Sequence, residues 1–188
     1  MDELRALVTA CPWLMAALTA VRDSGLPDAW IGAGVLRDLV WDERFGSGFD
    51  PARVKDVDVA FFDPTDLARD GKATELLATL LPAVPWEATN QAAVHTWFHT
   101  HFGGAPVPPL VSLAEAVATW PETATAVAVR LDAAGGLEVC APYGLTDLLG
   151  GVWRHNPRRT TMEQSRRRLA RQQPTQRWPG VRVEPATG

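Results

Sequence analysis

The stretch that most constrains the fold is Lys55-Asp56-Val57-Asp58-Val59-Ala60-Phe61-Phe62, in which acidic and apolar residues alternate. This alternation predicts a β-strand, because successive side chains of a strand point to opposite faces of the sheet. Asp56 and Asp58 then share one face, and Val57 and Val59 enter a core on the other. Two ionised carboxylates side by side repel each other, and a divalent cation relieves that repulsion. The stretch therefore predicts a metal-binding strand, with an exposed edge strand that carries two acids as the open alternative.

A second informative stretch precedes this strand, at Trp30-Ile31-Gly32-Ala33-Gly34-Val35-Leu36-Arg37-Asp38-Leu39-Val40-Trp41. Its pattern is typical of a strand end, a turn of small residues and an amphipathic helix. Glycine lets a backbone approach a phosphate closely, and the first N–H groups of a helix are unpaired donors at its positive end. A phosphate-binding turn at Gly34 followed by a metal-binding strand indicates a protein that handles a nucleoside triphosphate (NTP).

Together these stretches resemble the nucleotidyltransferase superfamily with the polymerase-beta-like fold, whose pattern is a Gly-Gly or Gly-Ser turn, a helix and an Asp-apolar-Asp-apolar strand. Ala33-Gly34-Val35-Leu36-Arg37-Asp38 is similar to the Gly-Gly-x-Val-Arg-Asp box of the tRNA-nucleotidyltransferase and poly(A)-polymerase branch. A family of small, mostly bacterial, uncharacterised nucleotidyltransferases is more similar still. That resemblance is carried by residues 33–41, 56–63, 86–97, 120–131 and 141–145.

Two departures accompany the resemblance. Ala33 stands where the wider superfamily has its first glycine. The interval from Gly34 to Asp56 is also longer than is usual there, which implies an extra loop through residues 45–51.

The resemblance implies an α/β (α+β) fold in which helices flank a small mixed β-sheet. It assigns residues 1–155 to a nucleotidyltransferase catalytic domain and leaves residues 156–188 as a basic C-terminal helix and tail. The expected catalytic residues and ligands of Mg²⁺ or Mn²⁺ are Asp56, Asp58 and Glu87. The expected nucleotide-binding residues are Gly34, Arg37, Asp38, Asn90 and Gln91.

Several of these assignments depend on the resemblance and leave alternatives open. Glu87 on its own would be taken as a surface acid between Trp86 and Ala88. Asp38 is also placed to order the loop ahead of the metal-binding strand. Glu122 and Thr123 lie in a segment that the resemblance places near the nucleotide, and an ordinary connection between a helix and a strand is the alternative for both.

The function implied is metal-dependent transfer of a nucleoside monophosphate from an NTP to a hydroxyl acceptor, with release of pyrophosphate. The sequence leaves the acceptor open among a small molecule, a protein and an RNA end. The alternative is a catalytically inactive nucleotide- or RNA-binding or regulatory module with the same fold, although the complete set of three acids argues against decay. A structural adaptor without nucleotide would leave the turn at residues 34–37 unexplained.

The composition of the chain limits the class of protein to which it can belong. The chain has 188 residues, 46% of them hydrophobic, which suits one domain with a sizeable core. No apolar run reaches the roughly 18 residues that span a bilayer, and Met1-Asp2-Glu3 is acidic where a signal peptide is basic. We therefore expect a cytoplasmic protein with no membrane partner. Cys11 and Cys140 lie among apolar neighbours, which favours buried thiols over a disulfide.

Charge is distributed unevenly along the chain. Residues 154–188 hold nine Arg against Glu163 and Glu184, although the net charge of the whole chain is −4. The predicted last helix carries Arg166, Arg167, Arg168 and Arg171, which suits contact with a polyanion; pairing with the acidic body, or simple solvation, is the alternative. His95 and His99 have the spacing of a helical zinc site, but we expect them, with His101, to be surface histidines.

Secondary structure follows from periodicity, caps and proline positions. The expected helices cover residues 3–22 with a break at Pro12, then 34–44, 67–81, 112–119 and 160–173. The expected strands are residues 29–31, the metal-binding strand 55–62, a strand at Glu87, and a hairpin of 127–131 with 137–140.

Overall fold

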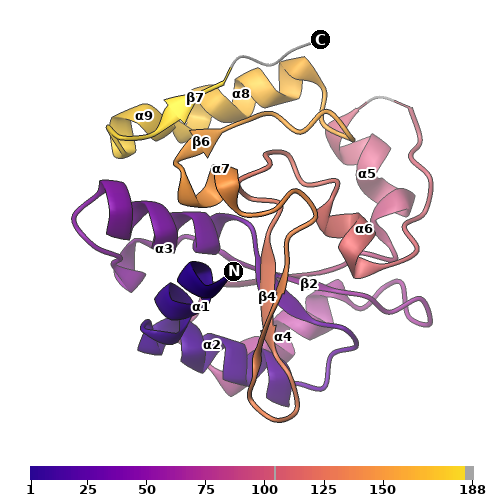
Figure 1. The fold of residues 1–188 in the computed structure, drawn as a ribbon. Coiled ribbons are helices and arrows are strands. Elements are labelled where there is room, and N and C mark those ends of the chain that lie inside the picture. The colour runs from indigo at the N-terminus through magenta and orange to yellow at the C-terminus, as the bar shows by residue number, and fades with distance from the viewer. Residues whose placement is uncertain (104, 185–188) are drawn as a thin grey trace.

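A five-stranded sheet with strand order β3-β2-β1-β4-β5 forms the centre of the structure (Figure 1). β2 and β3 run parallel and the other neighbouring pairs run antiparallel, which confirms the predicted mixed sheet flanked by helices. The strands are β1 (Trp30–Gly32), β2 (Val57–Phe61), β3 (Trp86–Asn90), β4 (Ala128–Leu131) and β5 (Leu137–Cys140), and a second small sheet pairs β6 (Val152–Trp153) with β7 (Arg182–Val183).

The computed structural model describes residues 1–103 and 105–184. Residue 104 and the last four residues of the predicted tail therefore lie outside the described residues. The helices are α1 (Asp2–Thr9), α2 (Pro12–Asp23), α3 (Gly34–Phe45), the short 3₁₀ helix η1 (Pro51–Arg53), α4 (Asp70–Leu80), α5 (Val94–Phe102), α6 (Leu113–Val117), α7 (Thr146–Leu149), α8 (Met162–Gln172) and α9 (Pro174–Arg177).

The two faces of the sheet are covered unequally. The main core packs α1, α2, α3 and α4 against one face, to which β2 contributes Val57, Val59 and Phe61. On the other face a smaller cluster joins Trp30, Ala60 and a few residues of α6 and β4. Because side chains alternate along β2, Asp58 lies on this second face. The thinner cover there leaves room for a cavity.

The C-terminal segment, residues 156–184, packs onto the body of the protein, where Arg177 contacts α3 (Figure 1). Trp178 is 1% exposed, and its ring meets the ring of Trp41 edge to face, with centroids 5.1 Å apart. β7 pairs with β6 in the second small sheet. The domain boundary at residue 155 stays a prediction, and the described part of this segment contributes to the main core.

The predicted strand 55–62 is shorter in the structure, because the ladder of β2 begins at Val57. The N–H of Val57 donates to the carbonyl of Pro85. In a parallel ladder residue 85 would next donate to the carbonyl of Lys55. Proline has no N–H, so the pairing stops there. Asp56 therefore stands just before the strand.

Two predicted helix starts are also corrected. The chain after β2 forms turns before α4 begins at Asp70, because Asp63 accepts hydrogen bonds from the N–H and hydroxyl of Thr65. α8 begins at Met162, two residues later than the predicted start at residue 160. Its capping box joins Thr161 to Gln164, since the carbonyl of Thr160 binds His155 Nε2 instead.

Among the described residues no single helix is long and apolar enough to cross a membrane; α1 and α2 have the necessary length and composition only when taken together, across a bend of 95°. Cys11 and Cys140 are half-buried free thiols.

Candidate active site

Three carboxylates meet at one wall of a cavity of about 530 Å³. Asp58 on β2 is in register with Glu87 on the neighbouring strand β3 and with Gly32 on β1. Registered residues of adjacent strands point to the same face of a sheet, so Asp58 and Glu87 lie side by side. Asp56 lines the same cavity. The structure therefore brings together the three acids that the sequence predicts as metal ligands, and their metal-binding role stays a prediction.

The environment of Asp58 disfavours its charged form. Burial, and then the negative charges of Asp56 and Glu87, raise the pKa of Asp58 to about 6, although the charge of Arg168 and a hydrogen bond from the N–H of Gly34 oppose the shift. A buried carboxylate with two acidic neighbours is stabilised by a bound cation.

The three carboxylates are suitable ligands for Mg²⁺ or Mn²⁺, because these ions prefer carboxylate oxygens and keep several waters. In residues 1–103 and 105–184, however, no three His, Cys, Asp or Glu side chains already form a closed metal cluster. Glu87 is exposed at the edge strand, where its side chain has room to move. A metal site that uses all three acids would therefore require Glu87 to move towards Asp56 and Asp58.

The turn between β1 and α3 forms the adjoining wall. Gly34 is the first residue of α3, and a Cβ placed on it would lie 3.8 Å from Arg37 Nη2 and 3.9 Å from Asp56 Oδ1. The basic and acidic sides of the cavity thus meet at Gly34. Gly32 is needed for packing, since a Cβ there would lie 2.5 Å from the ring of Trp120.

Ala33 has an unusual backbone, with φ +57° and ψ −120°, a region that favours glycine. Strain of this kind costs about 1–3 kcal/mol, and glycine loses about 0.5–1 kcal/mol more chain entropy on folding. We therefore expect Ala33→Gly to raise the free energy of unfolding by about 1 kcal/mol, measured by urea denaturation. Ala10→Gly is the matched control, since Ala10 has φ −76° and should lose stability. A loss in both variants would contradict strain at Ala33.

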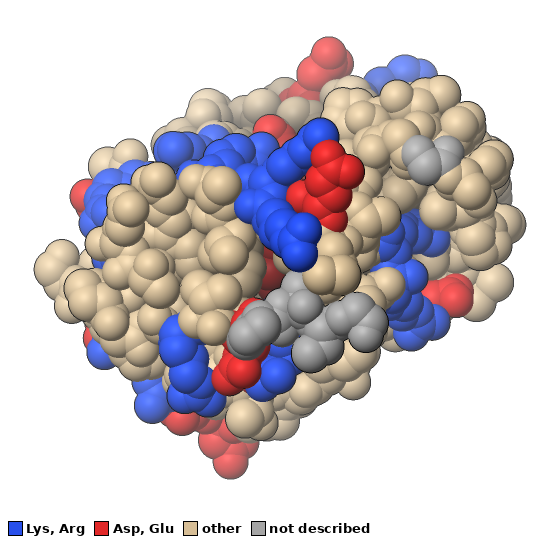
Figure 2. All heavy atoms as spheres, turned by 90° about the horizontal axis from the view of Figure 1, so that it is seen from above, with Lys and Arg blue, Asp and Glu red and all other residues tan. Residues whose placement is uncertain are grey.

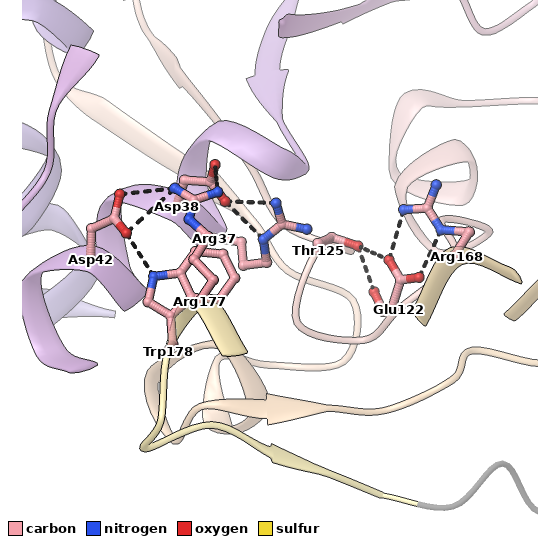
Figure 3. Close-up of polar contacts among 8 residues, drawn as sticks. All are labelled: Arg37, Asp38, Asp42, Glu122, Thr125, Arg168, Arg177 and Trp178. Atoms are coloured by element: carbon pink, nitrogen blue, oxygen red, sulfur yellow. Dashed lines mark hydrogen bonds and ion pairs between the residues drawn. The ribbon is translucent and has the colours of Figure 1, made fainter. Parts of the chain in front are cut away.

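Arg37 reaches the cavity from α3, where it is held by Asp38 (Figure 3). Arg37 Nε and Nη2 donate to Asp38 Oδ1 at 2.9 and 2.6 Å. Asp38 also accepts a bond from Arg177, which comes from the C-terminal segment. Asp38 lies behind Arg37 rather than in the cavity lining, so the structure does not support its predicted contact with the nucleotide. Its alternative role in ordering the loop before β2 stays a prediction.

A further wall of the cavity is formed by α8, from which Arg168 and Arg171 line it. Glu122 is completely buried and holds Arg168 with two bonds, to Nε at 2.8 Å and to Nη2 at 3.0 Å (Figure 3). The hydroxyl of Thr125 donates to the same carboxylate. Burial alone would lower the pKa of Arg168, but the bonds and charge of Glu122, with the charges of Asp58 and Asp56, raise it.

A second cavity of about 340 Å³ adjoins the first and shares Arg168 and Arg171 with it. The rings of Phe98, His101 and Phe102 line it. Figure 2 views the molecule from the side of α8 and α9 and shows Lys and Arg in several groups, with acidic side chains beside some of them. Among the ion pairs of this segment, Arg167 contacts exposed Glu163 and Arg168 contacts buried Glu122. Both arginines also line a cavity, so pairing with an acid and lining a cavity occur in the same side chains.

Gln91 and Asn90, the two remaining residues predicted to bind the nucleotide, differ in their position relative to the cavity. Gln91 lines the cavity. Asn90 does not, because its buried amide is fully used: its oxygen accepts from the N–H groups of Asp63 and Ala92, and its nitrogen donates to the carbonyls of Asp63 and Asp66. Asn90 therefore secures the turn after β2, and no group of its side chain is left for a nucleotide.

The histidines lie on α5, as their spacing predicts. Of the three, His101 lines the two cavities, and no metal cluster forms around them in the part of the chain that the structure describes. The chemistry of the cavity rests on its acids and arginines.

Sequence reasoning missed three residues that shape the site. Asp42, Arg177 and Trp178 form a cluster behind Arg37. A tryptophan directly after an arginine near the C-terminus, in a chain with eight Trp, is a signal of a docked segment rather than a free tail. No local pattern shows that Asp42 is its partner.

Solved structures place this fold in a known class. The first is a protein whose NMR structure reveals a CCA-adding enzyme head domain; it aligns with a TM-score of 0.81 and 30% identity over 100% of this chain and 96% of that one. A CCA-adding enzyme in complex with CTP aligns with a TM-score of 0.59 and 16% identity over 97% of this chain. The Thermotoga maritima CCA-adding enzyme complexed with tRNA gives the same TM-score and identity. This chain covers 43% and 42% of those two proteins.

The fold is thus that of a nucleotidyltransferase head domain. A sequence model described as Nucleotidyltransferase matches residues 19–183, so this chain belongs to that nucleotidyltransferase family. The match confirms the resemblance found in the sequence and the assignment of the chain as a nucleotidyltransferase. A comparison with curated proteins finds no match.

Proposed function

We propose that this protein transfers a nucleoside monophosphate from an NTP to a hydroxyl group and releases pyrophosphate, in a reaction that depends on Mg²⁺ or Mn²⁺. The observation that carries the proposal is the composition of the cavity, which is lined both by Asp56, Asp58 and Glu87 and by Arg168 and Arg171, with Arg168 near enough for its charge to act on Asp58. The charges of a metal–triphosphate complex are complementary to those of the cavity, because its cations would bind the acids and its phosphates would bind the arginines.

Each wall of the cavity has a task in this reaction. Asp56, Asp58 and Glu87 would hold the metal, which when bound lowers the pKa of the attacking hydroxyl and neutralises charge on the leaving group. The N–H groups at the start of α3, next to Gly34, would bind phosphate oxygens. Arg37 and Arg168 would stabilise charge that develops on the pyrophosphate. The protein's contribution is positioning and electrostatic stabilisation.

Two similarities support an NTP as the substrate. CCA-adding enzymes of the same fold form complexes with CTP and with ATP. Another has been captured with tRNA, which keeps an RNA end among the acceptors we propose, beside a small molecule or a protein hydroxyl. The second cavity, basic and lined by aromatic rings, is the adjoining space for an acceptor.

The test is incubation of the protein with each of the four NTPs labelled at the α-phosphate, with Mg²⁺ or Mn²⁺ and a cell extract. We expect label to appear in one fraction of the extract, separated into RNA, protein and small molecules. Asp56→Asn should reduce the transfer about 100-fold or more, since it removes a charged metal ligand.

Asp66→Asn is the matched control, because Asp66 lies in an exposed turn away from the cavity. It should transfer label at the wild-type rate. Binding of NTP by the wild type with no transfer into any fraction would instead identify an inactive nucleotide-binding module.

A further inference from the structure

We infer that Arg177, in the C-terminal segment, is a positioning residue that holds Arg37 at the cavity through Asp38, the carboxylate that both arginines share. The inference rests on the proposed function, in which Arg37 meets the triphosphate. Arg37 donates to Asp38 Oδ1, and Arg177 Nη1 donates to Asp38 Oδ2 at 2.8 Å (Figure 3). Each oxygen of one carboxylate therefore binds its own guanidinium, across 139 positions of sequence between Asp38 and Arg177.

Arg177 is itself anchored one helical turn further along α3. Its Nη2 lies 3.0 Å from Asp42 Oδ2, and the indole N–H of Trp178 donates to Asp42 Oδ1 at 2.6 Å. Asp38 and Asp42 are four residues apart and share a face of α3. Arg177 therefore binds two successive turns of the helix that begins at the phosphate-binding turn.

Sharing the charge of Asp38 has an electrostatic consequence. The side chains of Arg37, Asp38 and Asp42 are 6%, 14% and 4% exposed, so their interactions are weakly screened by water. With Arg177 present, two arginines balance two aspartates. Without it, the cluster would carry one excess negative charge, and Asp38 would neutralise Arg37 alone. Arg177 therefore leaves Arg37 with positive charge to offer to an anion.

The aromatic rings around Arg37 restrict where its guanidinium can lie. Its central carbon is 5.4 Å from the ring of Trp178, 5.8 Å from that of Trp153 and 6.0 Å from that of Trp41. Trp178 directly follows Arg177, so one short segment supplies both a ring and the second ion pair. A cation held in this way has lost its rotamer freedom before the ligand arrives, and such preorganisation favours binding.

The test measures the dissociation constants of MgATP, MgCTP, MgGTP and MgUTP for wild type, Arg37→Gln, Arg177→Gln and the double variant. For the NTP that binds best, each single variant should bind about tenfold more weakly, as expected for loss of a charge-assisted hydrogen bond. The double variant should bind no more weakly than Arg37→Gln, because Arg177 acts only through Arg37. Binding of the corresponding uncharged nucleoside should not change in any variant.

Two controls separate positioning from net charge and from folding. Arg182→Gln makes the same change of net charge at a side chain that is 66% exposed and lies outside the cavity lining; it should bind NTP as the wild type does. Arg177→Lys keeps the charge but lacks the planar fork, through which Arg177 binds Asp38 with Nη1 and Asp42 with Nη2. It should regain part of the affinity, and it provides the measurement if Arg177→Gln does not fold.

The outcomes distinguish this inference from the proposed function. A wild type that binds none of the four NTPs would overturn both. Wild-type affinity in Arg177→Gln, or in Arg177→Lys if only that variant folds, would overturn the inference alone. So would a double variant whose losses add, because additive losses mean that Arg177 acts independently of Arg37.

Discussion

Asp58→Asn is expected to abolish nucleotidyl transfer and, in the absence of metal, to make the protein more stable. The carboxylate is buried beside Asp56 and Glu87, and its pKa is raised from 3.8 to about 6. Ionising it at pH 7 therefore costs the folded state free energy, about 3 kcal/mol by linkage and less after structural relaxation. Asparagine has nearly the same shape and can still accept the hydrogen bond from Gly34. We expect a gain of about 1–2 kcal/mol in the metal-free variant.

Urea denaturation with and without Mg²⁺ measures both halves of this prediction. Mg²⁺ should stabilise the wild type and have little effect on Asp58→Asn. Because the folded-state pKa is raised, the wild-type penalty is full above pH 6, declines as pH falls from 6 towards 3.8, and disappears only below 3.8, where Asp58 is protonated in both states. The advantage of the variant should therefore shrink below pH 6 and vanish below pH 3.8. Lower stability of metal-free Asp58→Asn at pH 7 would contradict this account of the site.

The second large effect is expected from Arg168→Met. Glu122 is completely buried and would lose the guanidinium that binds both of its oxygens. An uncompensated buried carboxylate destabilises a protein strongly, here by about 3 kcal/mol. NTP binding should also fall about tenfold or more, because the cavity loses a positive charge that faces the phosphates. Thermal melting and nucleotide titration measure the two losses separately.

A double variant separates these two roles of Arg168. Glu122→Gln combined with Arg168→Met removes the buried charge, and the glutamine oxygen can still accept from Thr125, so most of the stability should return. NTP affinity should remain low. Arg167→Met is the matched control on α8: Arg167 is 78% exposed and pairs with exposed Glu163, so its loss should change stability by no more than about 0.5 kcal/mol. Recovery of NTP binding in the double variant would show that Arg168 only supports the fold.

These predictions treat the C-terminal segment as part of the site. α8 supplies Arg168 and Arg171 to the cavity, and Arg177 binds the carboxylate that holds Arg37. Arginines of this segment thus lie in the same cavity as the acids of β2 and β3. Contact with a longer polyanion remains a proposal, for which the arginines of the second cavity are the candidates.

Local patterns in the sequence were sufficient for one wall of the site. The alternation of acidic and apolar residues around Asp58 predicted a strand and the side of it that carries the acid, because the side-chain period of a strand is fixed by its backbone. The small-residue turn at Gly34 and the following helix were likewise predicted and observed. Family resemblance selected Glu87, and the parallel register of β2 and β3 then placed it beside Asp58.

Asn90 shows the limit of resemblance. Its position in a similar stretch predicted contact with a nucleotide, but its amide is used fully by the turn after β2. A polar residue can serve a ligand or the backbone, and which of these it does depends on how many partners the fold brings to it. The sequence alone does not show how many hydrogen-bond partners the fold brings to Asn90.

What the sequence determined by itself is therefore local: which residues alternate, where helices begin, and which acids share a face. Only the tertiary structure decided the ion pairs that support the arginines of the cavity, in which Glu122 meets Arg168 across 46 positions and Asp38 meets Arg177 across 139. The physical reason is that periodicity orients a side chain about its own strand or helix. The partner of a buried charge, by contrast, is set by which distant element packs against it, and that is decided by the whole core.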